Sequence, residues 1–263
     1  MRVTAIIPAR YGSTRFPGKP LVTLAGVPMV VRVARRVEQA RAAGVVDELL
    51  VATDDSRIAR VVREAGFSAR MTSPDHPTGT DRLAEVAADR PEAEIVCNVQ
   101  GDEPLIEPDA IAALVAPLRE DPELQMGTLK AALEDDRDRF DPNRAKLAVD
   151  ARERALTFTR QPIFDALPPG QTYFNREAVE RQHSLRPLAV YLHIGIYAYR
   201  REFLLGYSSL ERTPFERSER LEQLRALENG YPISAPTVRH RALPVDTPED
   251  AERVEAVLRA EGG

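Results

Sequence analysis

Strand-like apolar runs alternate with helix-like segments over residues 3 to 117, and this alternation restricts the fold more than any other feature of the chain. The strand-like runs are VTAIIPA (3–9), ELLVAT (48–53), FSARMT (67–72) and EIVCNVQ (94–100). Between the first two, Met29, Val33 and Val37 recur at the spacing of one helix face. Strands that alternate with helices form a parallel sheet with helices on both faces. We therefore predict an α/β fold built on a mostly parallel sheet.

The pattern changes near residue 126. Four strand-like runs follow with little helix between them: MGTLKAAL (126–133), AKLAVDA (145–151), ALTFTR (155–160) and LAVYLHIGIYAY (188–199). They predict a smaller, β-rich and partly antiparallel section over residues 126–199. We expect it to form one compact unit with an α/β part made of residues 1–125 and 200–263.

Three later segments complete the predicted organisation. The polar, proline-bearing residues 165–186 indicate a surface excursion. Residues 215–230 (FERSERLEQLRALENG) predict a helix that carries leucines on one face. Residues 247–260 predict a closing helix with Thr247 as its N-terminal cap and acidic residues in its first turn.

Composition and charge exclude several classes of protein. The net charge of -5 argues against a general nucleic-acid binder. Cys97 is the only cysteine, so no intrachain disulfide can form, and its apolar neighbours favour a buried, inert thiol. No run approaches the roughly 20 apolar residues of a membrane span, and the first apolar run is too short for a signal peptide. We expect a cytoplasmic protein without a membrane partner.

The loop that follows the first strand, within IIPARYGSTRFPGKPL (6–21), concentrates positive charge in an acidic chain. It contains Arg10, Arg15 and Lys19, and no Asp or Glu precedes Glu38. It is neither a P-loop nor a G-x-G-x-x-G dinucleotide loop. Its glycines nevertheless let backbone N–H groups approach an anion, and its cations supply charge. The loop therefore favours phosphate binding over an ordinary solvated loop.

Other polar residues are ambiguous from the sequence alone. Asp102 directly follows a buried strand and could hold Mg²⁺ for a polyphosphate, or it could cap the next helix. Asp246 stands before a capped helix, where a plain loop acid is the simpler interpretation. His193 lies in an apolar strand, where a packed core histidine is commoner than a catalyst. His76 has no partner at a metal-ligand spacing and is interpreted as a loop residue.

Taken together, these segments resemble the 3-deoxy-manno-octulosonate (KDO) cytidylyltransferase family, also called CMP-KDO synthetases. The matching stretches are IIPARYGSTRFPGKPL, VATDD, GTDRLAEV, NVQGDEPLI, HIGIYAYR, LEQLRALENG and VDTPEDAERV. They run in the family's order from residue 3 to about residue 258, so the resemblance covers nearly the whole chain. The first stretch is shared in outline with other sugar nucleotidyltransferases. Its combination with HIGIYAYR and LEQLRAL is much more specific to this family. The family fold is of the nucleotide-diphospho-sugar transferase type.

The resemblance also implies an activity. It implies transfer of CMP from CTP to KDO with release of pyrophosphate, for lipopolysaccharide biosynthesis, by a Mg²⁺-dependent homodimer. The nucleotide would be bound by Ala9, Arg10, Arg15, Lys19, Gly79, Thr80 and Arg82. The sugar acid would be bound by Gln100, Arg160, His193, Tyr197, Glu222 and Gln223. The catalytic residues would be Lys19, Asp102 and Asp246, of which the two aspartates would hold Mg²⁺.

The sequence departs from the family pattern at a few positions. Ser73 and Pro74 stand where the family has Arg and Ala, Asp81 replaces the more usual Glu, and residues 164–186 match poorly. Two alternatives stay open: a cytidylyltransferase for another acidic sugar, such as amino-KDO or a sialic-like acid, and a non-catalytic nucleotide-sensing protein. The presence of both Asp102 and Asp246 argues against the second.

Overall fold

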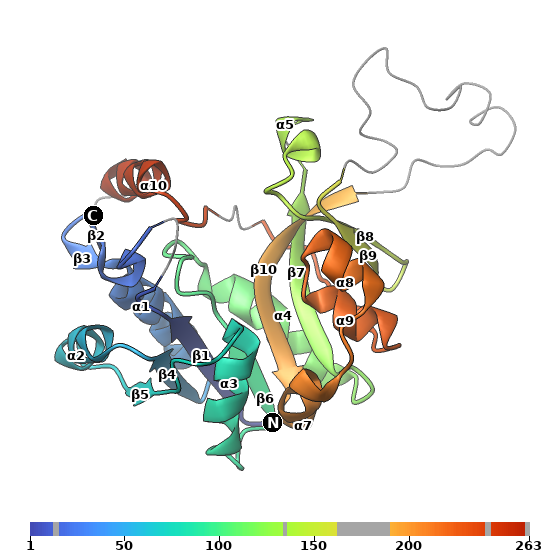
Figure 1. Ribbon diagram of the computed structural model, residues 1–263, viewed down its shortest axis with the longest axis horizontal. Coiled ribbons are helices and arrows are strands. Elements are labelled where there is room, and N and C mark those ends of the chain that lie inside the picture. Colours follow the sequence, from blue (N-terminus) through green and yellow to red (C-terminus); the bar gives the residue numbers. More distant parts are fainter. Residues whose placement is uncertain (13–15, 134–135, 162–189, 240–242, 261–263) are drawn as a thin grey trace, which may run out of the picture.

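A nine-stranded sheet forms the centre of the molecule (Figure 1). The computed structural model describes residues 1–12, 16–133, 136–161, 190–239 and 243–260. The strands of the first half are β1 (Val3–Ala9), β4 (Glu48–Thr53), β5 (Ala69–Met71) and β6 (Ile95–Asn98). They lie in the order β6-β1-β4-β5 and are all parallel. The predicted α/β fold with a parallel sheet is therefore confirmed.

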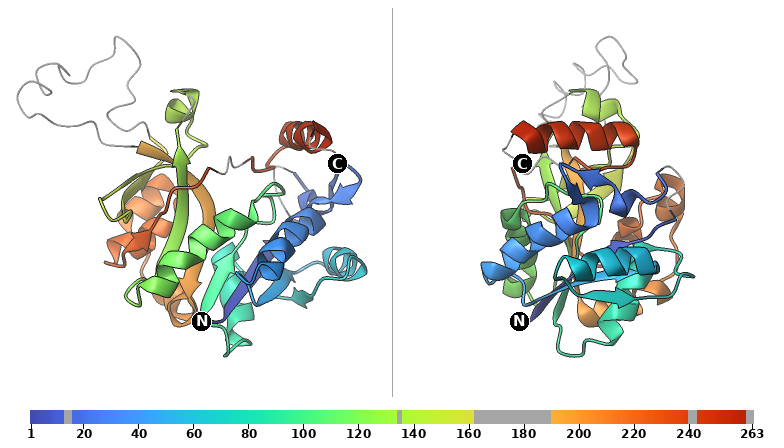
Figure 2. Two further views of the ribbon diagram at one scale, coloured as in Figure 1. Left: turned by 180° about the vertical axis from the view of Figure 1, so that it is seen from behind. Right: turned by 90° about the vertical axis from the view of Figure 1, so that its left-hand side faces the viewer.

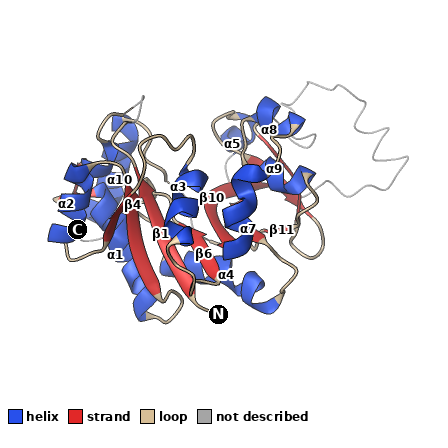
Figure 3. Cartoon of the chain, turned by 60° about the horizontal axis from the view of Figure 1, so that its bottom comes forward, coloured by secondary structure: helices blue, strands red, loops and turns tan. Residues whose placement is uncertain are grey.

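Helices cover both faces of this sheet, as Figures 2 and 3 show. The helices of the first half are α1 (Met29–Ala42), α2 (Ser56–Glu64), α3 (Gly79–Ala88) and α4 (Pro108–Glu120). Side chains of α1, α2 and α4 pack with Val3, Ala5 and Ile7 of β1. Ile6 faces the other way and packs with α3. β1 reads as a continuous apolar run because alternate residues are buried on opposite faces.

The strands of the second half extend the same sheet rather than forming a separate one. They are β7 (Met126–Ala132), β8 (Lys146–Val149), β9 (Ala155–Thr159), β10 (Val190–Arg200) and β11 (Ile233–Ser234). β10 pairs antiparallel with β6, with β7 and, at its start, with β8. β9 pairs antiparallel with β8, so these two strands branch from the main sheet. The partly antiparallel strands predicted after residue 126 are present.

The prediction of one helix over residues 215–230 was wrong, because this segment forms two helices. These are α8 (Pro214–Glu219) and α9 (Gln223–Glu228). Between them Arg220 adopts a left-handed backbone, with φ 55° and ψ 43°, and its N–H donates to the carbonyl of Glu216 at 2.8 Å. This left-handed residue ends α8, and Leu221 and Leu224 are still buried beyond the break.

The closing helix α10 (Pro248–Ala260) begins as predicted. The Thr247 hydroxyl accepts a hydrogen bond from the Asp250 N–H at 3.3 Å, and the Asp250 carboxylate accepts from the Thr247 N–H at 3.0 Å. α10 packs against the short strand β2 (Thr23–Leu24), at the edge of the molecule where α1 lies (Figure 1). This packing places the segment that leads into α10 beside the loops that follow β1.

The remaining elements are short. They are η1 (Lys19–Leu21), β3 (Val27–Pro28), α5 (Asp136–Phe140), α7 (Arg201–Gly206) and η3 (Tyr207–Ser209). Residues 165–186, predicted as a surface excursion, lie outside the described residues. Cys97 is buried in β6, as predicted, and burial raises the pKa of its thiol to about 12. Within the described part of the chain, no helix is both long and apolar enough to cross a membrane.

Candidate active site

A cavity of about 400 Å³, which we call the basic cavity, opens beyond the carboxyl ends of β1 and β6. Its predicted site residues are Ala9, Arg10, Lys19, Gly79, Arg82, Gln100, Asp102 and Asp246. In parallel α/β sheets this edge is where ligands bind. Arg15, also predicted to bind the nucleotide, lies outside the described residues.

Two glycines allow the loops around this cavity to approach one another. A Cβ atom at Gly101 would lie 2.8 Å from the Pro8 carbonyl oxygen, so only glycine lets the loop after β6 lie against the end of β1. Gly18 has φ 72°, a left-handed conformation that starts η1 and presents Lys19. The loop predicted for phosphate binding thereby faces the carboxylate that follows β6.

Lys19 connects the two aspartates predicted to be catalytic. Its Nζ donates to Asp102 Oδ2 at 2.7 Å and to Asp246 Oδ1 at 3.0 Å. Burial lowers the pKa of Lys19, but the two carboxylates outweigh burial, and the net direction is upward. The Val245 N–H donates to the Asp102 carbonyl at 2.9 Å, which holds the loop before α10 against the loop after β6. Three segments that are distant in sequence therefore meet at one charged cluster.

The two carboxylates fit a hard divalent cation. Because Asp102 and Asp246 both reach the same ammonium group, their oxygens converge on one point in the cavity. Mg²⁺ prefers such oxygen ligands and usually completes its coordination with water and phosphate oxygens. Across residues the structure describes, no cluster of three or more His, Cys, Asp or Glu forms a metal-binding group. The aspartates therefore suit a cation shared with a phosphorylated ligand.

The start of α3 forms another wall of the basic cavity. Thr78 and Asp81 make a capping box, in which each side chain accepts from the other residue's N–H at 3.2 Å. The Asp that replaces the family's more usual Glu at this position is thus long enough to cap the helix. Arg82 is 3% exposed, and its Nη2 donates to Asp54 Oδ2 at 2.7 Å. This partly buried ion pair holds the helix start that presents Gly79 to the cavity.

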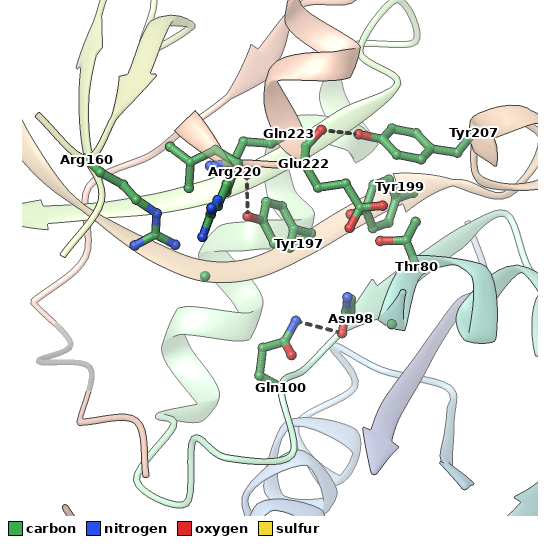
Figure 4. Close-up of a pocket in the computed structure, with 13 residues that line it drawn as sticks. Thr80, Asn98, Gln100, Arg160, Tyr197, Tyr199, Tyr207, Arg220, Glu222 and Gln223 are labelled. Atoms are coloured by element: carbon green, nitrogen blue, oxygen red, sulfur yellow. Dashed lines mark hydrogen bonds between the residues drawn. The ribbon is translucent and has the colours of Figure 1, made fainter. Parts of the chain in front are cut away.

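A second cavity of about 300 Å³, which we call the tyrosine cavity, is shown in Figure 4. It adjoins the first, since Gly79 and Gln100 line both. Its polar and aromatic lining consists of Thr80, Asn98, Gln100, Arg160, Tyr197, Tyr199, Tyr207, Arg220, Glu222 and Gln223. The hydroxyl of Tyr197 donates to Gln223 Oε1 at 3.2 Å, and that of Tyr207 donates to the Glu222 carbonyl at 2.7 Å. Burial raises the pKa of Glu222. The Gln223 amide nitrogen is buried and donates to no described residue.

A third cavity of about 270 Å³, the histidine cavity, lies beside the tyrosine cavity and contains His193. His193 Nε2 lies 2.9 Å from the Thr128 hydroxyl oxygen, which also lies 2.9 Å from the Ile196 carbonyl. The hydroxyl proton satisfies a carbonyl, so we assign the imidazole proton to Nε2, which leaves Nδ1 as an acceptor. Burial lowers the pKa of His193 to about 3, so the ring is neutral near pH 7.

The three cavities form one continuous cleft. Gln100 lines all three, and Asp102 lines both the basic and the histidine cavity. Arg160 and Tyr197 line the tyrosine and histidine cavities together. Every predicted site residue in the described part of the chain lines at least one of these cavities. Their assigned binding roles stay predictions.

Sequence reasoning missed some residues that line the cleft. His76, interpreted as a loop residue, lines the basic cavity, and its Nε2 pairs with the Glu85 carboxylate. The Ser73 N–H donates to the same carboxylate at 3.0 Å. Arg220 was missed because it lies within residues 215–230, which were predicted to form one continuous helix. Tyr199 lies in the HIGIYAYR stretch but was not selected from it, and Tyr207 lies outside all of the matching stretches.

Comparisons with known proteins identify the family of this chain. The cytidylyltransferase family model matches residues 4–237. The chain is 51% identical over 259 residues to the 3-deoxy-manno-octulosonate cytidylyltransferase of Syntrophotalea carbinolica, with 98% of this chain and 99% of that protein covered. The protein of the same name from Geobacter sulfurreducens is 50% identical over 254 residues, covering 97% and 98%.

A solved structure is also similar over its full length. It is that of a CMP:2-keto-3-deoxy-manno-octonic acid synthetase complexed with CTP, with a TM-score of 0.85 and 40% identity. The match covers 99% of this chain and 100% of that one. The fold is that of a sugar nucleotidyltransferase of the cytidylyltransferase class. Within that class, the chain belongs to the 3-deoxy-manno-octulosonate cytidylyltransferase family.

Proposed function

We propose that this protein transfers CMP from CTP to KDO and releases pyrophosphate. The relatives named above carry this activity in their names, and the similar solved structure contains CTP. The observation that carries the proposal is the position of Gln100 and Asp102, which stand where the basic cavity meets the cavities lined by polar and aromatic side chains. An anionic nucleotide and a hydroxyl-rich acid bound on either side would meet at these residues.

The basic cavity suits the nucleotide. Arg10 and Lys19 supply positive charge for a triphosphate, and the start of α3 supplies backbone N–H groups. In the free protein the Lys19 ammonium pairs with both Asp102 and Asp246. When phosphates enter, the same group can donate to phosphate oxygens without moving far from the carboxylates.

The reaction is an in-line substitution at the α-phosphorus. The anomeric hydroxyl oxygen of the sugar forms a bond to the α-phosphorus while the bond from that phosphorus to the bridging oxygen breaks. Pyrophosphate leaves with the electron pair, and the hydroxyl proton is released to solvent. The protein contributes positioning and charge neutralisation, because phosphoryl transfer needs little covalent help. Lys19 stabilises the charge that develops on the phosphate oxygens.

Asp102 and Asp246 are the residues that would hold Mg²⁺. The bound cation supplies neutralisation of the α-phosphate and the departing pyrophosphate. The chain's own contribution is to keep two carboxylates converged through Lys19 and through the hydrogen bond from Val245 to Asp102. Stripping divalent cations with a chelator should abolish turnover, and activity in excess chelator would remove the metal from the proposal.

The other two cavities suit the sugar acid. Neutral His193 offers an acceptor at Nδ1 for a sugar hydroxyl, and Glu222 offers carboxyl oxygens to further hydroxyls. The Gln223 amide nitrogen is a donor that a substrate oxygen could satisfy. Arg160 can pair with the sugar carboxylate, because a guanidinium matches a carboxylate in shape and charge.

We also propose that the active protein is a homodimer in the cytoplasm. Leu156 on β9 is 55% exposed and Phe215 on α8 is 64% exposed, so the β-rich side carries large apolar groups on its surface. Closed two-fold dimers are the commonest symmetric assembly. Light scattering should give twice the chain mass, and a mass of 29.2 kDa at micromolar concentration would contradict the dimer.

Pyrophosphate release measured over a panel of substrates tests the function. The panel crosses CTP, dCTP and UTP with KDO, amino-KDO and a sialic acid. We expect the highest kcat/KM for CTP with KDO. A higher kcat/KM with another acidic sugar would identify that sugar as the substrate instead. Tight CTP binding without turnover on any sugar would indicate a nucleotide-sensing protein.

A further inference from the structure

Arg220 holds an unusual backbone conformation at the edge of the tyrosine cavity. It is one of the non-glycine residues of the described chain with positive φ, at 55°, where an L-residue with a long side chain is disfavoured. The conformation ends α8 and turns the chain into α9. It also points the side chain into the cavity that contains Glu222 and Gln223 (Figure 4). Strained backbone of this kind concentrates at functional sites.

Among the residues that the structure describes, the guanidinium group of Arg220 has no partner that would explain this position. It makes no hydrogen bond or ion pair with any residue that the structure describes, and it is exposed. A buried arginine such as Arg225 behaves differently, because its guanidinium binds the Glu216 carboxylate through two hydrogen bonds of 2.9 and 2.6 Å. The Arg220 side chain is therefore available to a ligand in the cavity.

A second guanidinium reaches into the same cavity. Arg160 donates from Nη1 to the carbonyls of Pro142 and Asn143 at 3.1 and 3.2 Å, and these bonds fix the group while Nη2 bonds to no described residue. Glu222 is the one carboxylate among the described residues that line this cavity, and burial raises its pKa. The cavity thus holds more positive than negative charge, in addition to the amide donor of Gln223.

We propose that Arg220 binds the carboxylate of the acidic sugar together with Arg160, and so determines the preference for an acid over an uncharged sugar. The inference rests on the proposed function, because it assigns a role within that sugar site. Two guanidinium groups can bind both oxygens of one carboxylate with charge-assisted hydrogen bonds. The break between α8 and α9 then serves to place the second guanidinium.

Arg220→Gly is the decisive variant. Glycine adopts φ 55° without strain, so the substitution removes the guanidinium and preserves the break between the helices. Steady-state kinetics should show a KM for KDO raised about tenfold or more, with the KM for CTP changed less than about twofold. The melting temperature should stay the same or rise. Arg217→Ala is the matched control, since Arg217 is an exposed arginine of α8 that lines none of the three cavities.

The carboxamide of KDO, which has no negative charge, separates recognition of the carboxylate from a general change of the site. Wild-type protein should prefer KDO over the carboxamide, and Arg220→Gly should lose most of that preference. An unchanged KM for KDO in Arg220→Gly, or an equal rise for KDO and its carboxamide, would overturn the inference while leaving the proposed function intact. Absence of wild-type turnover with every acidic sugar would overturn both.

Discussion

Removal of the Lys19 ammonium group tests the charged cluster most directly. Its Nζ lies 2.7 Å from Asp102 and 3.0 Å from Asp246, and the substitution Lys19→Ala removes both contacts. The fold of η1 should survive, because the hydrogen bond from the Val22 N–H to the Lys19 carbonyl uses only backbone atoms. The variant therefore separates the role of the charge from the role of the loop.

The stability cost in the free protein should be small. The side chain of Lys19 is 15% exposed, whereas those of Asp102 and Asp246 are 25% and 39% exposed, so solvent screens the pairs. Pairs of this kind contribute about 0–1 kcal/mol each. The pKa of Lys19 is raised in the folded protein, so this contribution is fully present below the ordinary lysine pKa of 10.5 and is lost only as pH rises through the folded pKa. We expect the melting temperature to fall by a few degrees at pH 7.

The effect on CTP should be larger. A hydrogen bond that involves a charged group contributes about 1.5–3 kcal/mol. Loss of one such bond to a phosphate would lower kcat/KM for CTP roughly 10- to 150-fold. The assay is pyrophosphate release with CTP varied at saturating sugar, and Lys19→Arg serves as a control that keeps the charge. Unaltered kcat/KM for CTP in a folded Lys19→Ala protein would refute the assignment of Lys19 to the phosphates.

Three further predictions concern other parts of the cleft. Asp102→Asn and Asp246→Asn should each lower kcat about a hundredfold or more, and high Mg²⁺ should recover part of the loss. The double variant should lose less than the sum of the two single losses in activation free energy. Near-normal turnover in either single variant would argue against a shared cation. Gly101→Ala should destabilise the fold by about 1–3 kcal/mol in thermal denaturation, because its Cβ would lie 2.8 Å from the Pro8 carbonyl oxygen, and an unchanged melting temperature would contradict this. In the wild type, the unfolded chain takes up a proton at His193 below about pH 6.5, whereas the folded protein takes it up only near pH 3. The free energy of unfolding of the wild type should therefore fall by about 2 kcal/mol between neutral pH and pH 5. His193→Gln should remove this dependence of the free energy of unfolding on pH. Equal slopes in both proteins would show that another group is responsible.

The amino-acid sequence alone determined the sheet and the edge at which the site lies. β1 and β6 are apolar runs because both faces of each strand are covered, and this burial leaves a local pattern that can be read without the fold. The rule that ligands bind beyond the carboxyl ends of parallel strands then pointed to Lys19 and Asp102 before any contact was known. The resemblance added the distant residues that we predict to bind the sugar, which no spacing would have selected.

Only the tertiary structure decided which distant groups meet. Asp246 is 227 residues from Lys19, and their contact depends on the packing of α10 against β2 rather than on any local periodicity. The helix break at Arg220 likewise leaves no signal in the sequence, because the left-handed residue is an arginine and not a glycine. Helical spacing therefore predicted one continuous helix where there are two. Periodicity reports which face of a segment is buried, because burial repeats with the turn of the helix or strand. It carries no information on long-range partners or on a single left-handed residue, because these are selected by the energy of the whole packed chain.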